Sequence, residues 1–204
     1  MQTSNIRSLV FISLFAALFI VMSSLTIKFG GSFVPITLQT LAVGLAGLFL
    51  TPRNAFLSIF IVILLAAIGL PLFSGQGGIP HLTGPTGGFI FAFPFCSFLV
   101  SLAIGGFLRS KMSKGNKALA FIVFFIIFEL FSSITSYIPG IPWLMNALDL
   151  SFQKAMTVGF YPFIIGDAIK SLAGAILATS LTPYIVHIRS STVRNSEEKS
   201  TFNV

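Results

Sequence analysis

Two ionisable side chains interrupt an apolar stretch toward the carboxyl end of this chain. Residues 160–177 read F-Y-P-F-I-I-G-D-A-I-K-S-L-A-G-A-I-L, which places Asp167 and Lys170 three positions apart. In a helix, this spacing puts both side chains on one face. Lys170 could donate to the carboxylate of a small ligand, and Asp167 could accept its N–H groups in charge-assisted hydrogen bonds. The alternative is an intrahelical ion pair that binds nothing, although a buried pair is often no more stable than apolar packing.

Further candidates for the same site lie elsewhere in the chain. Glu129 stands alone in F-F-I-I-F-E-L-F-S-S, where it could touch a ligand or could be protonated and hydrogen-bonded to Ser132 or Ser133. Tyr161, Trp143 and some of the 24 phenylalanines could supply the apolar walls of a pocket. These residue types favour a small, partly apolar carboxylic acid that also carries amide or urea N–H groups.

The composition places these charges in a membrane. The 204 residues are 55% hydrophobic and only 8% charged, against about 25% charged in soluble domains, and the mean hydropathy is +0.98. A single cysteine, Cys96, excludes an intrachain disulfide and a thiolate metal cluster. His81 and His187 are far apart in the chain, so the sequence favours neither a metal site nor a cofactor.

The sequence predicts an all-α integral membrane protein, a single transmembrane domain of six helices. Each apolar segment approaches the roughly 20 residues that cross a bilayer. The first resembles a signal peptide but lacks an A-x-A cleavage site, so we expect it to be retained. The last has Pro162 in the position of a helix's first turn. The predicted spans are 6–27, 34–50, 55–73, 87–108, 118–138 and 157–188, and residues 190–204 are expected to form a polar, frayed cytoplasmic tail.

The distribution of cations predicts the orientation of these spans, because cytoplasmic loops carry an excess of Lys and Arg. One set of helix ends has nine cations and the opposite set has two, so we expect both termini to be cytoplasmic. The basic run 109–117 is more typical of a loop facing anionic lipid than of a nucleic-acid site. The nine are Arg7, Arg53, Arg109, Lys111, Lys114, Lys117, Arg189, Arg194 and Lys199, and the two are Lys28 and Lys154.

Three predicted outer loops, 28–34, 74–86 and 139–156, are rich in polar and turn-forming residues. Residues 74–88 read S-G-Q-G-G-I-P-H-L-T-G-P-T-G-G, which lacks the G-x-x-x-x-G-K-[ST] order of a phosphate-binding loop. Glycines here could permit turns and a close approach of the backbone to a ligand. A flexible linker is the alternative.

Four motifs together resemble the BioY family, and the resemblance runs from about residue 8 to residue 188. They are V-P-I-T-L-Q-T-L-A-V-G-L-A-G at 34–47, A-A-I-G-L-P-L-F at 66–73, G-P-T-G-G-F at 84–89 and G-D-A-I-K at 166–170. BioY proteins are biotin-specific substrate-binding subunits (S components) of energy-coupling-factor (ECF) vitamin transporters. The resemblance implies six helices with internal termini, biotin as the ligand, and a multi-pass protein of a prokaryotic cell membrane. It also implies a transmembrane scaffold and ATPase subunits as partners.

The resemblance also implies roles for particular residues. Asp167 and Lys170 correspond to the paired acidic and basic residues of the family's last helix. Gln39 lies in the P-I-T-L-Q-T motif at the outer end of the second helix. The loop of Gly84, Pro85, Thr86, Gly87 and Gly88 is expected to lie over the pocket.

Docking on the scaffold often uses alanines spaced A-x-x-x-A on the first helix of such subunits. This chain has Ser13-x-x-x-Ala17 instead, a departure that still leaves small residues for close helix contact. Alternatives to the S component are a solitary biotin facilitator or a protein for another vitamin. An intramembrane enzyme using Asp167 and Glu129 is disfavoured because the sequence offers no activated nucleophile or metal cluster. A purely structural membrane subunit would tolerate apolar replacement of Asp167 and Lys170.

Overall fold

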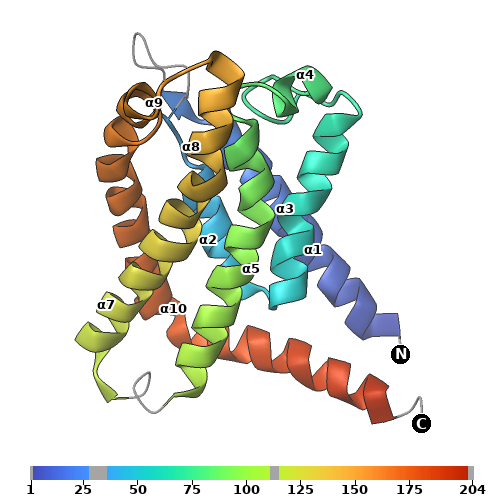
Figure 1. Cartoon of the computed structure of the whole chain (residues 1–204). Coiled ribbons are helices and arrows are strands. Elements are labelled where there is room, and N and C mark those ends of the chain that lie inside the picture. The colour runs from blue at the N-terminus through green and yellow to red at the C-terminus, as the bar shows by residue number, and fades with distance from the viewer. Residues whose placement is uncertain (1, 28–35, 111–114, 202–204) are drawn as a thin grey trace.

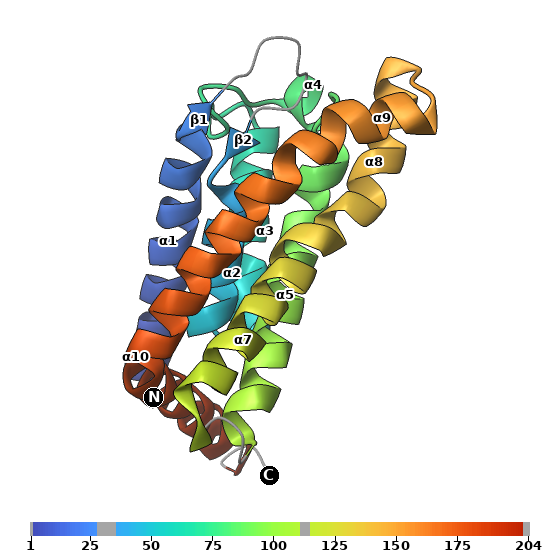
Figure 2. The same cartoon turned by 90° about the vertical axis from the view of Figure 1, so that its left-hand side faces the viewer.

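Helices run along the length of the molecule and pack side by side in an elongated bundle (Figures 1 and 2). The structure is a computed structural model that describes residues 2–27, 36–110 and 115–201, so the predicted loop 28–34, Lys111 and Lys114 lie outside the described residues. The first part contains α1 (Gln2–Ser24), β1 (Thr26–Ile27), β2 (Ile36–Thr37), α2 (Gln39–Phe49), α3 (Pro52–Ala67) and α4 (Ile79–Leu82). The second contains α5 (Gly87–Arg109), α7 (Lys117–Ile127), the π-helix η1 (Phe128–Ile134), α8 (Thr135–Leu148), α9 (Phe152–Gly159) and α10 (Tyr161–Thr201).

Four of the described helical segments are long and apolar enough to cross a membrane, namely Ile6–Ser24, Gly87–Arg109, Lys117–Leu148 and Tyr161–Arg189. The apolar helices α2 and α3 are shorter. The 11 residues of α2 rise only about 16 Å, roughly half the apolar thickness of a bilayer. The predicted span 34–50 therefore contains non-helical backbone: β2 pairs antiparallel with β1, and α2 begins only at Gln39.

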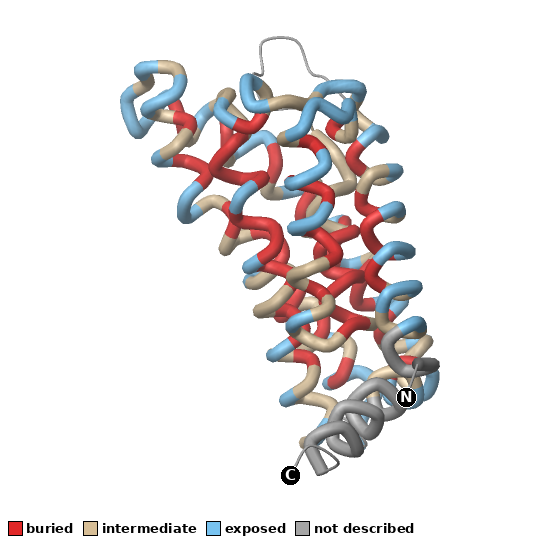
Figure 3. Tube along the Cα trace, turned by 90° about the vertical axis from the view of Figure 1, so that its right-hand side faces the viewer, coloured by how far each residue is buried: buried red, intermediate tan, exposed pale blue. Residues whose placement is uncertain are grey.

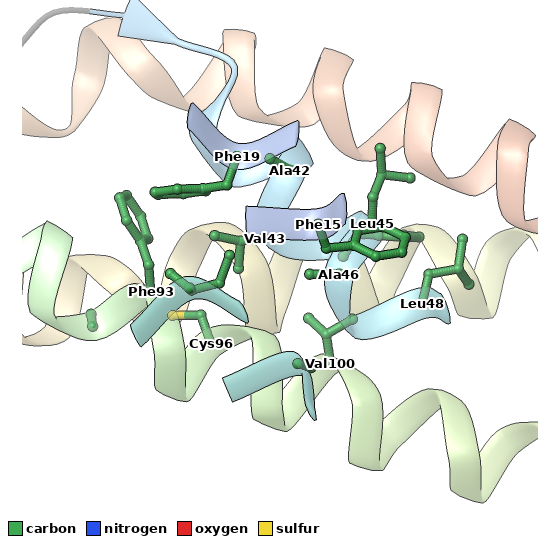
Figure 4. Close-up of a cluster of buried hydrophobic side chains, with 14 of the residues drawn as sticks. Phe15, Phe19, Ala42, Val43, Leu45, Ala46, Leu48, Phe93, Cys96 and Val100 are labelled. Carbon is green, nitrogen blue, oxygen red and sulfur yellow. The ribbon is translucent and has the colours of Figure 1, made fainter. Parts of the chain in front are cut away.

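The core follows α2 and α5 down the middle of the bundle. Every residue of α2 from Ala42 to Leu48 is buried, and Figure 3 shows buried residues facing inward on most helices. Phe19 of α1 makes an edge contact with Phe93 at a centroid separation of 5.9 Å (Figure 4). It makes a second edge contact with Phe73 at 6.0 Å. Large apolar side chains such as Leu9 and Leu14 lie exposed on the outer face of α1. Apolar residues both inside and outside a bundle indicate that its surroundings are lipid.

The segment 139–156 differs from its prediction as an outer loop. The helix that begins at Lys117 continues through η1 and through Pro139 and Pro142 until Leu148, and α9 follows from Phe152. Proline is tolerated here because, away from water, leaving a whole turn of backbone unpaired costs more than losing one N–H group. Asp149, in the left-handed conformation with φ 51°, ends α8.

The other predicted boundaries shift by smaller amounts. The helix of the third predicted span, 55–73, ends at Ala67, close to Gly69 with its φ of 103°. In the predicted span 157–188, α10 begins at Tyr161, so that Pro162 lies in the first turn as its sequence predicts. The backbone of α10 stays helical to Thr201, because no glycine or proline interrupts residues 184–201, and this differs from the expected frayed tail.

Arg189 of α10 joins the carboxyl end of α2 to Ser101 of α5. Its Nη1 donates to the carbonyl oxygens of Gly47, Leu48 and Leu50 at 2.9, 3.1 and 2.9 Å. Its Nη2 donates to the carbonyl oxygen and Oγ of Ser101 at 2.8 and 3.2 Å. The guanidinium therefore satisfies carbonyls that the short helix α2 leaves free at its carboxyl end.

Candidate functional site

A cavity of about 690 Å³ lies among residues of α2, α5, α8 and α10 and of the segment between α3 and α5. Its volume falls within the range of small-molecule pockets. Pro80 and His81 of α4, the short helix labelled in Figure 1, belong to its lining. Its walls combine phenylalanine rings with a few polar groups: Thr37, Gln39, Thr40, Phe73, Ser74, Gln76, His81, Phe89, Phe93, Ser136, Tyr137, Phe163, Asp167 and Lys170.

Asp167 and Lys170 form an ion pair at this cavity. Lys170 Nζ lies 2.6 Å from Asp167 Oδ1 and donates to the carbonyl oxygen of Thr37 at 3.1 Å. The Asp167 side chain is only 3% exposed and that of Lys170 is 10% exposed. Both line the cavity. The structure thus brings together the two residues that the sequence singles out, and it gives Lys170 a backbone acceptor from the non-helical stretch before α2.

Two further residues hold Asp167, and the sequence analysis missed both. Thr40 Oγ1 donates to Asp167 Oδ1 at 3.2 Å, and the Tyr137 hydroxyl donates to Asp167 Oδ2. With Lys170, these residues give Asp167 three hydrogen-bond donors. The sequence could have indicated Thr40, because it follows Gln39 in the P-I-T-L-Q-T motif. No motif marks Tyr137, which precedes Pro139 and Pro142.

Gln39 lines the cavity, as the resemblance implies, but its amide already has protein partners. Its Nε2 donates to Ser23 Oγ at 3.2 Å, and its Oε1 accepts from Thr37 Oγ1 at 2.9 Å. These bonds tie the start of α2 to the end of α1. Gln39 therefore shapes the mouth of the cavity by joining these two elements.

The turn between α3 and α4 forms one wall of the cavity. The backbone of Phe73 and of Gln76 exchanges two hydrogen bonds of 2.9 Å, and the Ser74 hydroxyl donates to Ser23 O at 2.6 Å. Gly77 permits this fold because a Cβ atom there would lie 2.0 Å from a carbonyl oxygen. His81 stacks on Phe73 at 5.6 Å, and burial lowers the pKa of its imidazole, which is therefore neutral at pH 7.

The loop 84–88 divides into two parts. Gly84, Pro85 and Thr86 line the cavity, whereas Gly87 and Gly88 do not. Cβ atoms at Gly87 and Gly88 would lie 2.9 and 2.4 Å from atoms of Trp143, so these two glycines make room for the indole. Trp143 Nε1 in turn donates to Gly84 O at 2.9 Å. Trp143 thus lies behind the loop and holds it in place, outside the cavity lining that the sequence analysis expected it to join.

Tyr161 and Glu129 also lie outside the cavity lining. Tyr161 is 61% exposed at the start of α10. Glu129, on η1, is half-buried, and its Oε2 has no hydrogen-bond partner among the described residues. The expected bonds to Ser132 and Ser133 are not made, since Ser132 donates to Phe128 O at 2.7 Å and Ser133 Oγ lacks a partner within the described chain. In residues 2–27, 36–110 and 115–201, no three His, Cys, Asp or Glu side chains gather as metal ligands would.

Known proteins share both the sequence and the fold. Residues 1–186 match the BioY family. A "probable biotin transporter BioY" of Pyrococcus horikoshii is 37% identical over 171 residues, covering 83% of this chain and 93% of that protein. The biotin transporter BioY2 of Lactococcus lactis is 35% identical over 188 residues, covering 92% and 96%. A crystal structure of the S component for biotin from an ECF-type ABC transporter aligns with a TM-score of 0.78 and 26% identity over 90% of this chain and 94% of that one. The chain belongs to the BioY family.

Proposed function

We propose that this protein is the biotin-binding S component of an ECF-type transporter, which captures biotin at the outer end of the bundle. The observation that carries this proposal is the cavity itself, which combines phenylalanine walls with the ion pair of Asp167 and Lys170. The relatives named as biotin transporters share most of their length with this chain. The protein is a transporter subunit and not an enzyme, in agreement with the sequence prediction.

The contacts of the ion pair leave one hydrogen-bond donor and one acceptor for a ligand. An ammonium group has three N–H donors, and Lys170 uses two on Asp167 Oδ1 and Thr37 O. A carboxylate has about four acceptor positions, and Asp167 uses three on Lys170, Thr40 and Tyr137. The remaining donor and acceptor lie side by side, because the two charged groups are in contact.

This arrangement fits the ureido group of biotin better than its carboxylate. A ureido edge presents a carbonyl acceptor beside an N–H donor, which Lys170 and Asp167 can meet together. A ligand carboxylate would meet Lys170 but would be repelled by Asp167. The sequence analysis assigned Lys170 to the carboxylate and Asp167 to the ureido group, at opposite ends of biotin. The 2.6 Å contact between Lys170 Nζ and Asp167 Oδ1 argues against that assignment. We place the ureido ring on the pair and the carboxylate toward the mouth at residues 74–86.

The membrane topology belongs to the same proposal: six spans, with both termini in the cytoplasm. The start of α1 and the end of α10 lie at one end of the bundle, as an even number of crossings requires (Figure 1). The short helix α2 can belong to a crossing because non-helical backbone is tolerated at membrane depth where it lines a cavity, as Thr37 before α2 does. Cysteines introduced at Gly78 and Gly115 should react with impermeant reagents from opposite sides, Gly115 from the cytoplasm. Labelling of both from one side would contradict the six-span topology.

Partner subunits are part of the proposal, because the chain has no nucleotide-binding motif of its own. Ser13 and Ala17 are both exposed on the outer face of α1, among exposed apolar residues. Small residues there allow close approach of a second helix. We therefore keep this face as the docking site for the transmembrane scaffold. Replacing both residues with leucine should prevent co-purification with the scaffold and ATPase subunits while leaving biotin binding intact.

Direct binding of radiolabelled biotin to the purified protein is the decisive experiment. We expect one biotin per chain, competition by unlabelled biotin, and no competition by a vitamin without a ureido group. Absence of saturable binding by folded protein would overturn the proposal. Binding without partners, combined with uptake by proteoliposomes that contain only this chain, would instead favour the solitary facilitator.

A further inference from the structure

Three buried oxygen atoms on η1 and α10, two helices that pack together, have no hydrogen-bond partner in the described part of the chain. They are Glu129 Oε2, Ser133 Oγ and Ser171 Oγ. Ser133 and Ser171 are only 1% and 2% exposed. The Ser171 side chain lies beside the Glu129 carboxyl group, although neither of these two oxygens has a partner of acceptable geometry. Buried polar groups are normally paired, so a cluster of unpaired ones requires an explanation.

The backbone at this cluster is also unusual. Glu129 lies in η1, a π-helical segment of seven residues within the long helix Lys117–Leu148. The wider turn changes the direction in which its side chains point, and such segments are often found at functional sites. η1 packs against α10, next to α7 (Figure 2). The carboxyl group of Glu129 is thereby brought close to the residue that follows Lys170.

The charges around Glu129 do not balance if every carboxyl group is ionised. Asp167 and Lys170 of α10 act on Glu129 electrostatically, and Tyr137 of α8 is the third titratable group near it. Among the other helices packed on η1, α2 has no acidic or basic residue, and Arg109 of α5 and Lys117 of α7 lie at the far ends of their helices. One ammonium group therefore faces two carboxyl groups. An uncompensated charge within a membrane is costly, so one carboxyl group must carry a proton.

The hydrogen bonds indicate which carboxyl group that is. Asp167 accepts from Lys170, Thr40 and Tyr137, so its oxygens already have three donors and a proton there would displace one of them. Glu129 Oε2 accepts no hydrogen bond among the described residues. A proton on Glu129 would also give this carboxyl group an O–H donor for the Ser171 hydroxyl beside it. The proton therefore belongs on Glu129.

We propose that Glu129 is a positioning residue that carries a proton while biotin is bound, and that loss of this proton turns its carboxylate into a competitor of Asp167 for Lys170. This inference rests on the proposed function. In the protonated state Lys170 stays between Asp167 and Thr37 O, where its third N–H group faces the cavity. In the ionised state Lys170 is drawn toward η1, and the donor and acceptor for the ureido ring no longer lie side by side.

The dissociation constant of biotin measured between pH 5.5 and 9 tests this inference. For the wild-type protein we expect the constant to rise with pH, approaching tenfold per pH unit above the Glu129 transition, because binding is linked to one proton. Glu129→Gln, which mimics the protonated side chain and removes no group from the cavity, should keep the low-pH affinity across this range. Ser171→Ala should move the wild-type transition to lower pH, because the O–H group loses its acceptor.

Controls separate Glu129 from the other titrating groups. A biotin derivative with an amidated carboxylate excludes titration of the ligand. If Glu129→Gln keeps the wild-type pH dependence, the proton belongs to Lys170 or Tyr137 and the inference is wrong. It is equally wrong if both proteins bind with a constant affinity at every pH, or if Glu129→Gln folds normally but fails to bind. Absence of binding by the wild-type protein at any pH would instead contradict the proposed function.

Discussion

Helix α10 carries Lys170, which is buried, and Arg189, which is partly buried, and the surroundings of these two cations differ. Arg189 makes five hydrogen bonds, four to backbone carbonyl oxygens and one to the Ser101 hydroxyl. Lys170 makes one ion pair and one bond to a carbonyl oxygen, and it borders the cavity. Arg189 has no carboxylate partner in these bonds, whereas Lys170 has Asp167.

The difference shows how a buried charge in a membrane protein can be assigned a role. The protein offers hydrogen-bond acceptors for all four terminal N–H groups of Arg189, so this side chain joins α10 to α2 and α5. Lys170 keeps one donor, next to one remaining acceptor of Asp167, and both face a space large enough for a ligand. We therefore propose a binding role for Lys170, whose partners are incomplete beside a cavity, and a structural role for Arg189, whose partners are complete.

The largest effect is expected at the cavity. Lys170→Met and Asp167→Asn should each weaken biotin binding by about 2–5 kcal/mol, the usual result of removing one partner of a buried charge pair. With the ureido ring on the pair, biotin and its amide derivative should lose affinity equally in both variants. Isothermal titration of both ligands measures this. If Lys170→Met loses affinity for biotin but not for the amide derivative, Lys170 contacts the biotin carboxylate. That result would overturn the orientation that we propose.

Arg189→Met should have the opposite signature, a loss of stability with an unchanged dissociation constant for biotin. Each buried acceptor left unpaired costs about 1–3 kcal/mol. The substitution removes the hydrogen-bond donor of the carbonyl oxygens of Gly47, Leu48 and Leu50 at the end of α2. Thermal unfolding in detergent should show a clear decrease in midpoint. Arg53→Met, at an exposed arginine of α3, is the matched control and should leave the midpoint unchanged. Equal unfolding midpoints for the two variants would contradict the proposed role of Arg189 in stabilising the bundle.

The same contrast explains how much the sequence could predict. Asp167 and Lys170 were found because charges are conspicuous in an apolar segment, and the motif G-D-A-I-K supported them. Arg189 was counted only as an inner cation, since nothing in the sequence shows that its partners are carbonyl groups on α2 and α5. Tyr137 was missed because its role arises from a contact between residues 30 positions apart.

The helical predictions failed where local signals compete with the membrane. Pro139 and Pro142 favour a loop in isolation, but the cost of unpaired backbone in apolar surroundings keeps α8 helical to Leu148. The start of α2 was placed too early for the converse reason. The hydrophobicity of residues 34–38 favours a helix, whereas Ile36 and Thr37 are extended because β2 pairs with β1.

The two tyrosines test the boundary of the cavity. Tyr137→Phe removes the hydrogen bond to the carboxyl group that pairs with Lys170, and hydrogen bonds to charged groups contribute about 1.5–3 kcal/mol. We expect biotin binding to weaken by an amount in this range, because Asp167 loses the donor that orients it. Tyr161→Phe removes the same hydroxyl from a side chain that is 61% exposed, and surface substitutions usually change free energies by less than about 0.5 kcal/mol. Equal losses of affinity in the two variants would place Tyr161 in the site after all.

The smallest effect is expected at the loop that Trp143 holds. Trp143→Phe keeps an aromatic ring against Gly87 and Gly88 but removes the hydrogen bond from Nε1 to Gly84 O. A single neutral hydrogen bond contributes about 1 kcal/mol, so the loop should open about fivefold more often. Amide exchange at Thr83, Gly84 and residues 86–88 measures this directly, and biotin should slow the exchange in the wild-type protein by closing the loop over the ligand. In Trp143→Phe the exchange should be faster without biotin and recover only partly with it. Identical exchange rates with and without biotin in the wild-type protein would mean that this segment is a linker and does not cover the site.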